Sequence, residues 1–410
     1  MLLPVTLCAA QFLLVLDVTI VAVALPSLRH AFGLPPEALQ WVITAYTLAF
    51  GGLLVATGRA GDLLGHRRLF RAGLVAFGGA SLACALAPSL AALVAGRAVQ
   101  GAGAAMAAPA ALALTAALPD RRRAVAWLTA AAAAGGASGW VLGGVLTTAL
   151  GWPAVFLVNV PLCAAAALVA GRLPERRGAA RSLDLPGTAA ITAALALLVL
   201  GLTEVRAALP AAAAAFALFL WVERRAEDPI LPAWALRRPG FVRANAVALA
   251  LTATTTPAMF LAVLFQQESL GRSALEAGLW CAPCNVAVIA GSLLGRRVPM
   301  AGGLAAIAAG ALALLTLAPA ALPVAFVLMG AGLGCASVAS TATGTSALGD
   351  GEQGIASGVL NASAQIGSAL GLAVIAGLGY RAGFAVAAAV ALGGAANLNL
   401  RRGRKLTTGG

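Results

Sequence analysis

The sequence predicts an all-α membrane protein with about fourteen transmembrane helices. Of its 410 residues, 61% are hydrophobic and only 10% are charged, and the mean hydropathy is +0.94. Apolar runs of roughly 18 to 25 residues recur along the whole chain, and this is the length that a helix needs to cross a bilayer. The basic residues gather in the short stretches between these runs. Together these features are typical of a polytopic membrane protein.

The apolar runs give the predicted spans in chain order. They lie at 4–28, 39–58, 69–87, 89–118, 124–150, 152–171, 187–204, 208–222, 241–266, 275–294, 300–318, 322–348, 354–378 and 381–400. The span at 208–222 is the least clear because it is short and rich in Ala. The first span is not preceded by a basic segment, so we expect it to be retained rather than removed as a signal peptide.

The Lys and Arg residues are divided unequally between the two sides of the predicted membrane. With a cytoplasmic N-terminus, 22 of the 27 fall in cytoplasmic loops, whereas Arg29, Arg206, Arg272 and Arg381 fall outside and Arg97 falls within a span. Since positively charged loops stay in the cytoplasm, we expect a multi-pass protein of the cell membrane with both termini cytoplasmic. The net charge of +13 therefore belongs to loops rather than to a basic domain face, which argues against nucleic-acid binding.

An internal repeat organises the spans. The stretch "DLLGHRRLFRAGL" from Asp62 recurs as "SLLGRRVPMAGGL" from Ser292, and "QGAG" from Gln100 recurs as "MGAG" from Met329, at offsets of 230 and 229. A shared offset indicates a duplicated six-helix bundle, with chance similarity in an Ala- and Gly-rich background as the alternative. We expect an N-terminal bundle at 1–172, linkers with two inserted helices at 173–240, a C-terminal bundle at 241–400 and a basic cytoplasmic tail at 401–410.

One carboxylate, Asp17, lies in the middle of the first span, where a charge costs free energy. In the fourth span Arg97 and Gln100 are three residues apart, so a guanidinium and an amide share one helix face. Burial favours the protonated form of a carboxyl group and a nearby cation favours the ionised form. An Asp subject to both can gain or lose a proton as water access changes. A purely structural ion pair between helices is the alternative.

Four stretches resemble, in order and position, the signature motifs of the major facilitator superfamily, and most closely those of its fourteen-helix drug:proton antiporter branch. They are "LDVTIVAVALP" at 16–26, "GRAGDLLGHRR" at 58–68, "LVAGRAVQGAGAA" at 93–105 and "GGASGWVLGG" at 135–144. The resemblance covers nearly the whole chain. It implies two six-helix bundles plus two inserted central helices. It also implies proton-coupled export of small, lipophilic drug or antibiotic molecules by alternating access, with a proton-coupled nutrient importer of the same fold as the alternative.

The resemblance also assigns residues to roles. Asp17 and Arg97 match the proton-coupling positions; Gly58, Asp62, Gly65, Arg67 and Arg68 match a cytoplasmic motif thought to latch the two halves in one state; and Gly135, Gly139, Gly143 and Gly144 match the antiporter motif. Glycines four apart also let helices approach closely. Trp140 stands where this motif usually has Pro, so the helix bend that Pro causes cannot be assumed. Ala22 and Leu63 depart from a common Asn and a frequently basic residue.

Further polar or aromatic residues within predicted spans are candidates for the wall of the substrate cavity. They are Gln11, Trp41, Tyr46, Gln100, Asn159, Gln266, Asn285, Asn361 and Gln365. No metal site, cofactor or catalytic constellation is expected, because His30 and His66 fall in predicted loops and no H-E-x-x-H motif occurs. We expect a proton as the coupling ion, a small molecule as substrate, the lipid bilayer as surroundings and a monomeric protein.

Overall fold

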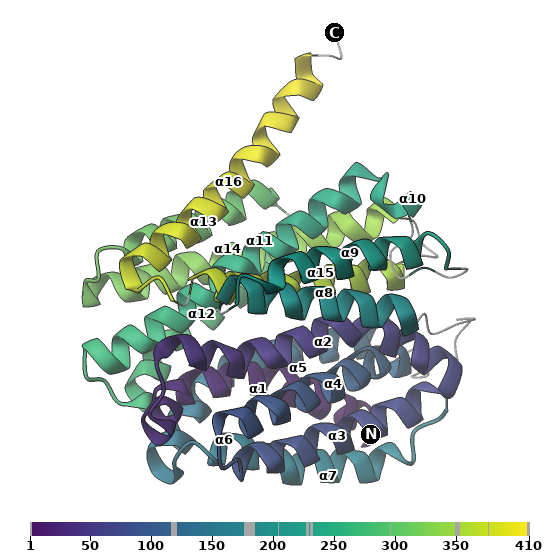
Figure 1. The fold of residues 1–410 in the computed structure, drawn as a ribbon, viewed down its shortest axis with the longest axis horizontal. Helices are drawn as coiled ribbons and strands as arrows, with labels where there is room; N and C mark the ends of the chain where they lie inside the picture. The colour runs from purple at the N-terminus through teal and green to yellow at the C-terminus, as the bar shows by residue number, and fades with distance from the viewer. Residues whose placement is uncertain are drawn as a thin grey trace. The chain divides into compact units, whose positions relative to one another are not determined.

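The computed structural model confirms the all-α fold. It describes residues 2–115, 121–175, 185–203, 205–226, 229, 233–295, 297–348, 353–375 and 377–407, and among these it contains helices and turns but no strand. The chain forms two compact units (Figure 1): Met1–Ile230 with Gln267–Leu279, and Leu231–Gln266 with Trp280–Gly410. Arg176, Arg177, Arg181 and Arg296, which belong to the predicted basic loops, lie outside the described residues, as does the end of the predicted tail at 408–410.

The first unit contains nine helices among its described residues. They are α1 (Leu2–Phe32), α2 (Pro36–Leu64), α3 (His66–Ala85), α4 (Leu90–Thr115), α5 (Arg121–Leu150), α6 (Ala154–Leu157), α7 (Asn159–Ala170), α8 (Leu185–Thr203) and α9 (Ala208–Glu223). Helix α1 packs along α5, and α4 packs against both α2 and α3. The predicted inserted helices form the hairpin α8–α9, and α8 lies against α2 in this unit. A β-carbon at Gly52 of α2 would lie 2.7 Å from Thr192 Oγ1 of α8, so a small residue permits that contact.

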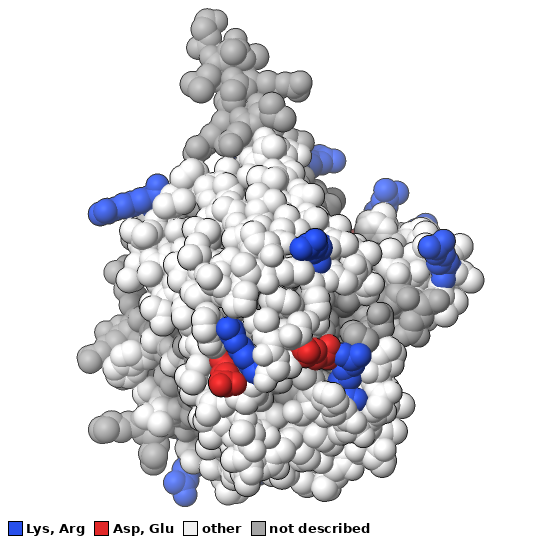
Figure 2. All heavy atoms as spheres, turned by 90° about the vertical axis from the view of Figure 1, so that its left-hand side faces the viewer, with Lys and Arg blue, Asp and Glu red and all other residues white. Residues whose placement is uncertain are grey.

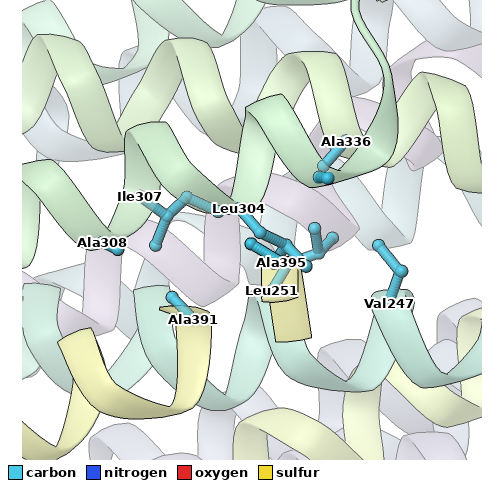
Figure 3. Close-up of a cluster of buried hydrophobic side chains, with 9 residues drawn as sticks. Val247, Leu251, Leu304, Ile307, Ala308, Ala336, Ala391 and Ala395 are labelled. Atoms are coloured by element: carbon cyan, nitrogen blue, oxygen red, sulfur yellow. The ribbon is translucent and has the colours of Figure 1, made fainter. Parts of the chain in front are cut away.

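The second unit holds the remaining helices, apart from the segment 267–279 that groups with the first. They are α10 (Ala233–Leu236), α11 (Pro239–Leu264), the π-helix η1 (Phe265–Ser269), α12 (Ala274–Leu294), α13 (Met300–Leu314), the 3-10 turn η2 (Pro319–Ala321), α14 (Leu322–Leu348), α15 (Gln353–Ile375) and α16 (Tyr380–Thr407). Figure 3 shows a buried cluster where α11, α13, α14 and α16 meet, with Leu251, Leu304 and Ile307 as its larger side chains. The remaining members are mostly Ala, which brings the helices close together.

The two halves of the repeat make the same contact between helices. In the first unit, a β-carbon at Gly73 of α3 would lie 2.7 Å from the carbonyl oxygen of Gly103 in α4. In the second unit, a β-carbon at Gly303 of α13 would lie 2.8 Å from the carbonyl oxygen of Gly332 in α14. These four glycines are the ones that the offsets of 230 and 229 superpose. The pairs α1–α5 and α3–α4 likewise correspond to α11–α15 and α13–α14. The repeat inferred from sequence is therefore a repeat of structure, although the detailed domain bounds stay a prediction.

Length and hydropathy mark the membrane-crossing helices. Among the described residues, nine helices are long and apolar enough to cross a membrane, and the bent pair Ala38–Leu54 and Ala56–Leu64 of α2 forms a tenth candidate. The four shorter apolar helices Ala154–Ala170, Pro186–Leu202, Ala208–Glu223 and Met300–Leu314 occupy the remaining predicted spans. A count of fourteen is thus plausible, but the four short segments do not by themselves meet the length of a span.

Two local features differ from the sequence-based expectation. Both histidines lie in helices rather than loops, because α1 continues to Phe32 beyond His30 and α3 begins at His66 itself. Helix α2 bends by 52°, which the sequence did not predict because no Pro lies at the bend. The pair Gly51–Gly52 precedes the bend by about one turn and makes the helix easier to deform.

Candidate functional site

Asp17 is completely buried in the first unit, and its carboxylate accepts hydrogen bonds from three side chains on two other helices, α4 and α7. Its Oδ2 is paired with the Arg97 guanidinium of α4. Its Oδ1 accepts from Asn159 Nδ2 of α7 at 2.8 Å and from Gln100 Nε2 of α4 at 3.3 Å. The polar residues predicted on separate spans therefore meet at one point, and the charge of Asp17 is compensated rather than isolated.

Arg97 is held from several sides and is 1% exposed. Its Nε donates to the Val42 carbonyl oxygen of α2 at 2.8 Å, and its Nη1 donates to Gln100 Oε1 at 2.9 Å as well as to Asp17. The guanidinium carbon lies 4.5 Å from the centre of the Tyr46 ring, a cation–π distance. Arg97 consequently keeps two oxygen acceptors and an aromatic face even when Asp17 carries a proton.

Gln100 is fixed at both ends of its amide. Its Nε2 donates to Ser81 Oγ of α3 at 2.7 Å in addition to Asp17, and its Oε1 accepts from Arg97 and lies 3.5 Å from Cys84 Sγ. Ser81 in turn donates to the Phe77 carbonyl at 2.8 Å. Sequence reasoning missed Ser81, although a hydroxyl residue in the third predicted span was a usable signal. These contacts lock the orientation of Gln100.

Three antiporter-motif glycines of α5 position the segment of α1 that carries Asp17. A β-carbon at Gly139 would lie 3.0 Å from the Leu16 carbonyl oxygen and one at Gly143 would lie 2.8 Å from that of Ile20, while Gly135 faces the Phe12 carbonyl oxygen. These α1 residues are four apart, so they share a helix face. The stripe therefore brings the two backbones into contact on both sides of Asp17.

The fourth glycine of this motif faces another segment of the first unit. A β-carbon at Gly144 would lie 2.6 Å from Leu275 Cα, at the start of α12. Trp140 is 6% exposed, and α5 runs through it as one continuous helix. The helix is therefore not interrupted at the position of the missing Pro, because Trp keeps the backbone N–H that Pro lacks.

The predicted latch motif forms the tight junction between α2 and α3. Gly65 separates the helices with φ of +104°, a conformation that L-residues rarely adopt. The carboxylate of Glu175 lies beside it and accepts a 3.0 Å hydrogen bond from the Arg67 backbone N–H. Its Oε2 is 3.4 Å from Arg67 Nε and 3.7 Å from Arg68 Nε. Sequence reasoning missed Glu175, since it follows α7 and is far from the motif along the chain.

The remaining motif residues lie on the last turns of α2. Asp62 Oδ1 accepts a 2.9 Å hydrogen bond from His66 Nε2, one helical turn onward. His66 is buried and packs on Gly61. Gly58 has open space where a β-carbon would stand. Within the first unit, Asp62 at the end of α2 is thus bonded to His66 at the start of α3.

The other predicted cavity residues are divided between the two units. Gln11 and Trp41 are half-buried in the first unit. In the second unit, Gln266 is buried and donates to the Ala262 carbonyl and to Cys281 Sγ, and Asn285 is half-buried, with no hydrogen-bond partner for its Nδ2 among the residues that the structure describes. Asn361 is exposed and Gln365 is half-buried on α15. Their place in a cavity stays a prediction.

A small polar cavity lies at the C-terminal ends of α1 and α5 in the first unit. It measures about 250 Å³, and its lining includes Ser27, His30, Thr147 and Glu268. The carboxylate of Glu268 is paired with Arg29 beside it. This volume is below the roughly 300–1,000 Å³ of typical small-molecule pockets, so it does not serve as a drug-sized site in this conformation.

The sequence-family comparison decides the identity of this fold. The family model described as Major Facilitator Superfamily matches residues 7–372. The chain belongs to the Major Facilitator Superfamily. Among curated members of the superfamily, the cephamycin export protein CmcT of Amycolatopsis lactamdurans is 40% identical, covering 90% of this chain and 82% of the relative. The puromycin resistance protein pur8 of Streptomyces alboniger is 36% identical, covering 90% and 80%. The multidrug resistance protein Stp of Mycobacterium tuberculosis is 32% identical, covering 89% and 73%.

Solved structures of two other transporters show the same fold at low sequence identity. The crystal structure of the POT family transporter PepTSo matches with a TM-score of 0.76 and 12% identity, over 100% of this chain and 99% of that chain. The inward-open structure of the xylose transporter XylE from E. coli matches with a TM-score of 0.66, 13% identity and 96% and 95% coverage. Membership makes this chain a multi-pass membrane protein of a transporter family rather than an enzyme family.

Proposed function

We propose that the protein exports small, lipophilic drug or antibiotic molecules across the cytoplasmic membrane in exchange for protons, by alternating access. Several relatives that match most of the chain are named for the export of, or resistance to, antibiotics. These relatives support export rather than uptake. Their names differ in the compound, so they favour a broad class of substrates and do not select one molecule.

The observation that carries the proton-coupling part is the environment of Asp17. A buried carboxylate that faces a permanent cation is stable when ionised, and Arg97 retains the Val42 carbonyl, Gln100 Oε1 and the Tyr46 ring when that carboxylate is protonated. Both protonation states are therefore accessible without leaving a bare charge. A membrane potential of about 150 mV supplies roughly 3.5 kcal/mol per proton, which sustains a substrate gradient of a few hundredfold.

The proposal includes an orientation with both termini in the cytoplasm. Figure 2 shows described Arg side chains on one face of the molecule, some of them beside Asp or Glu side chains. The orientation rests on the sequence, in which the basic residues gather in the loops that are predicted to be cytoplasmic. The junction around Gly65, Arg67 and Arg68 then lies in the cytoplasm, where the latch role is proposed. The coupling ion is a proton, no further cofactor takes part, and the transporting unit is a monomer.

Everted membrane vesicles test the proposal. On addition of an antibiotic such as puromycin, with respiration driving acidification, the wild type should release protons from the vesicle lumen and accumulate the compound. Asp17→Asn should abolish both processes while the protein remains in the membrane, because the amide cannot ionise. Unchanged accumulation by this variant would exclude Asp17 as the coupling site, and accumulation only in right-side-out vesicles would show import.

A substitution at Val5 provides a control on the same helix. Val5 is exposed on α1 and belongs neither to the Asp17 cluster nor to the predicted cavity residues. We expect proton exchange to survive in Val5→Ala. Loss of exchange in both variants to the same extent would attribute the effect to general damage of α1 rather than to the carboxylate.

A further inference from the structure

We propose that Asn159 is the switching partner of the coupling carboxylate: its amide donates to ionised Asp17 and, after rotating, accepts a hydrogen bond from protonated Asp17. This inference rests on the proposed proton coupling and deepens it. In the structure Asn159 is completely buried at the first turn of α7. Its Nδ2 donates to Asp17 Oδ1 at 2.8 Å, whereas its Oδ1 has no hydrogen-bond partner among the described residues.

A buried amide oxygen without a hydrogen-bond partner is unfavourable, because it loses its hydrogen bonds to water and gains none in return. This cost points to a role for Asn159 beyond packing, because the Nδ2 group of the same amide makes a good hydrogen bond to Asp17. If Asn159 served only to hold α1 against α7, an oxygen satisfied by a neighbour would be the cheaper arrangement. The unpaired Oδ1 gives Asn159 an acceptor that is not used while Asp17 is ionised.

Protonation of Asp17 changes its Oδ1 from a hydrogen-bond acceptor into a donor. Oδ2 faces the Arg97 guanidinium, which has only donors, so the incoming proton bonds to Oδ1. The new O–H group then points at Asn159 Nδ2, and two donors face each other. Rotation of the Asn159 amide by half a turn about its Cβ–Cγ bond places its Oδ1 toward the O–H and restores the hydrogen bond. The O–H bond is the only covalent change, and it breaks when the proton returns to water on the opposite side.

The two other donors to Asp17 cannot make this exchange. Arg97 has no acceptor at all. Gln100 has one, but its Oε1 accepts from Arg97 and its Nε2 donates to Ser81 Oγ at 2.7 Å. Rotation of the Gln100 amide would place its NH₂ group against the guanidinium and its oxygen against the Ser81 hydroxyl oxygen. Only Asn159, with one end bound and the other unpaired, is able to match both protonation states of the carboxyl group.

The ionisable groups around Asp17 do not provide a competing acceptor. Besides Arg97, the Tyr46 phenol of α2, the Cys84 thiol of α3 and the Cys163 thiol of α7 lie within electrostatic range of the carboxylate. The Tyr46 hydroxyl donates to the Leu14 carbonyl, 3.5 Å away. Helices α5 and α6 contribute no ionisable group among their described side chains. The switch therefore depends on an amide and not on a second titrating residue.

Infrared difference spectroscopy of the purified full-length protein tests the inference. Low-pH minus high-pH spectra should contain the C=O stretching band of protonated Asp17, identified by its loss in Asp17→Asn. In Asn159→Leu the band should move to higher frequency, because the acid O–H loses its acceptor. Asn159→Ser should keep the band near its wild-type position, since a hydroxyl can donate or accept. Asn159→Ala replaces the Leu variant should that one fail to fold.

Gln100→Leu is the matched control, because it removes the other amide that contacts Asp17. Since Gln100 only donates to the carboxylate, we expect the band of the protonated acid to stay in place in this variant. An Asp17 band that is present but unmoved in Asn159→Leu and Asn159→Ala would overturn the switching role and leave proton coupling intact. Absence of any Asp17 band across the pH range of transport would overturn the proposed function itself.

Discussion

The carboxylate of Glu175 occupies the space that a β-carbon of Gly65 would need. Such a β-carbon would lie 2.5 Å from Glu175 Oε1 and 2.6 Å from its Cδ. The missing side chain therefore allows Glu175 to reach the first turn of α3 and bind the Arg67 backbone N–H. The glycine of the latch motif thus has two separate requirements, a positive φ and an open approach for an acidic residue from the end of α7.

Gly65→Ala should destabilise the protein by about 1–3 kcal/mol, because Ala strains a backbone at φ of +104° and collides with Glu175. Thermal unfolding in detergent measures this loss. The double variant Gly65→Ala/Glu175→Ala removes the collision but keeps the strained φ, so it should recover only part of the loss. Full recovery would show that the backbone conformation contributes nothing, and no recovery would show that the Glu175 contact is unimportant.

Gly139→Ala should cost about 1–3 kcal/mol through overpacking and should alter proton exchange, because the added methyl group collides with the Thr19 side chain and approaches the Leu16 carbonyl oxygen of α1. Gly79→Ala is the control: Gly79 is exposed on α3 with no atom within 4 Å of its β-carbon position. Replacing a helical Gly there should stabilise by about 0.5–1 kcal/mol. Equal thermal stabilities of the two variants would contradict a specific α1–α5 contact.

The sequence predicted the centre of the site better than its surroundings. Asp17 and Arg97 were paired because each is an isolated charge within an apolar span, and burying either alone is too costly. Gln100 followed from helical spacing. The hydrogen bond from Asn159 to Asp17 could not be predicted. The two residues are 142 positions apart in the sequence, so their contact depends on how α7 packs. Glu175 was missed for the same reason.

The repeat was the most informative signal for the fold. The offsets superposed Gly73 with Gly303 and Gly103 with Gly332, and these residues form equivalent close contacts. Small residues in the sequence predict where helices pack, because helices in a bilayer associate through close packing at such residues. The bend in α2 could not be predicted from the sequence, since no Pro lies at it. The start of α3 at His66 was missed because Gly65 alone makes the turn.

Asp62→Asn should leave folding and membrane insertion intact and should change the balance between inward- and outward-open forms. In the wild type, His66 Nε2 lies 2.9 Å from Asp62 Oδ1. The amide oxygen of the variant can still accept this hydrogen bond, but the negative charge is lost. Rates of cysteine modification at predicted cavity positions such as Gln365 measure the balance. Identical modification and transport rates in variant and wild type would remove the charge of Asp62 from the mechanism.

Cysteines introduced beside Arg122, Arg177 and Arg237, in a background without native Cys, should react with a membrane-impermeant reagent only from the cytoplasmic side. Positive charge keeps these loops inside. A cysteine at Arg206, in the turn before α9, should react only from the opposite side. Reaction of any of the first three from outside would contradict the predicted topology, whatever the number of spans.

Arg97→Lys should weaken coupling even though it preserves the positive charge. The guanidinium reaches the Val42 carbonyl through Nε while Nη1 binds Asp17 and Gln100, and a single ammonium group cannot hold these directions in the same plane. The contact with Asp17 therefore changes in geometry while the positive charge stays. Proton exchange should follow a pH profile that differs from that of the wild type.

The measurement is the pH profile of antibiotic-induced proton release from purified protein. Arg97→Lys also leaves the Tyr46 ring in place, 4.5 Å from the present guanidinium carbon, so a buried ammonium keeps an aromatic neighbour and the protein should still fold. Val99→Ala is the control, since Val99 lies on α4 with an exposed side chain and should leave the profile unchanged. An unchanged profile in Arg97→Lys would show that the planar guanidinium is not needed for proton exchange at Asp17.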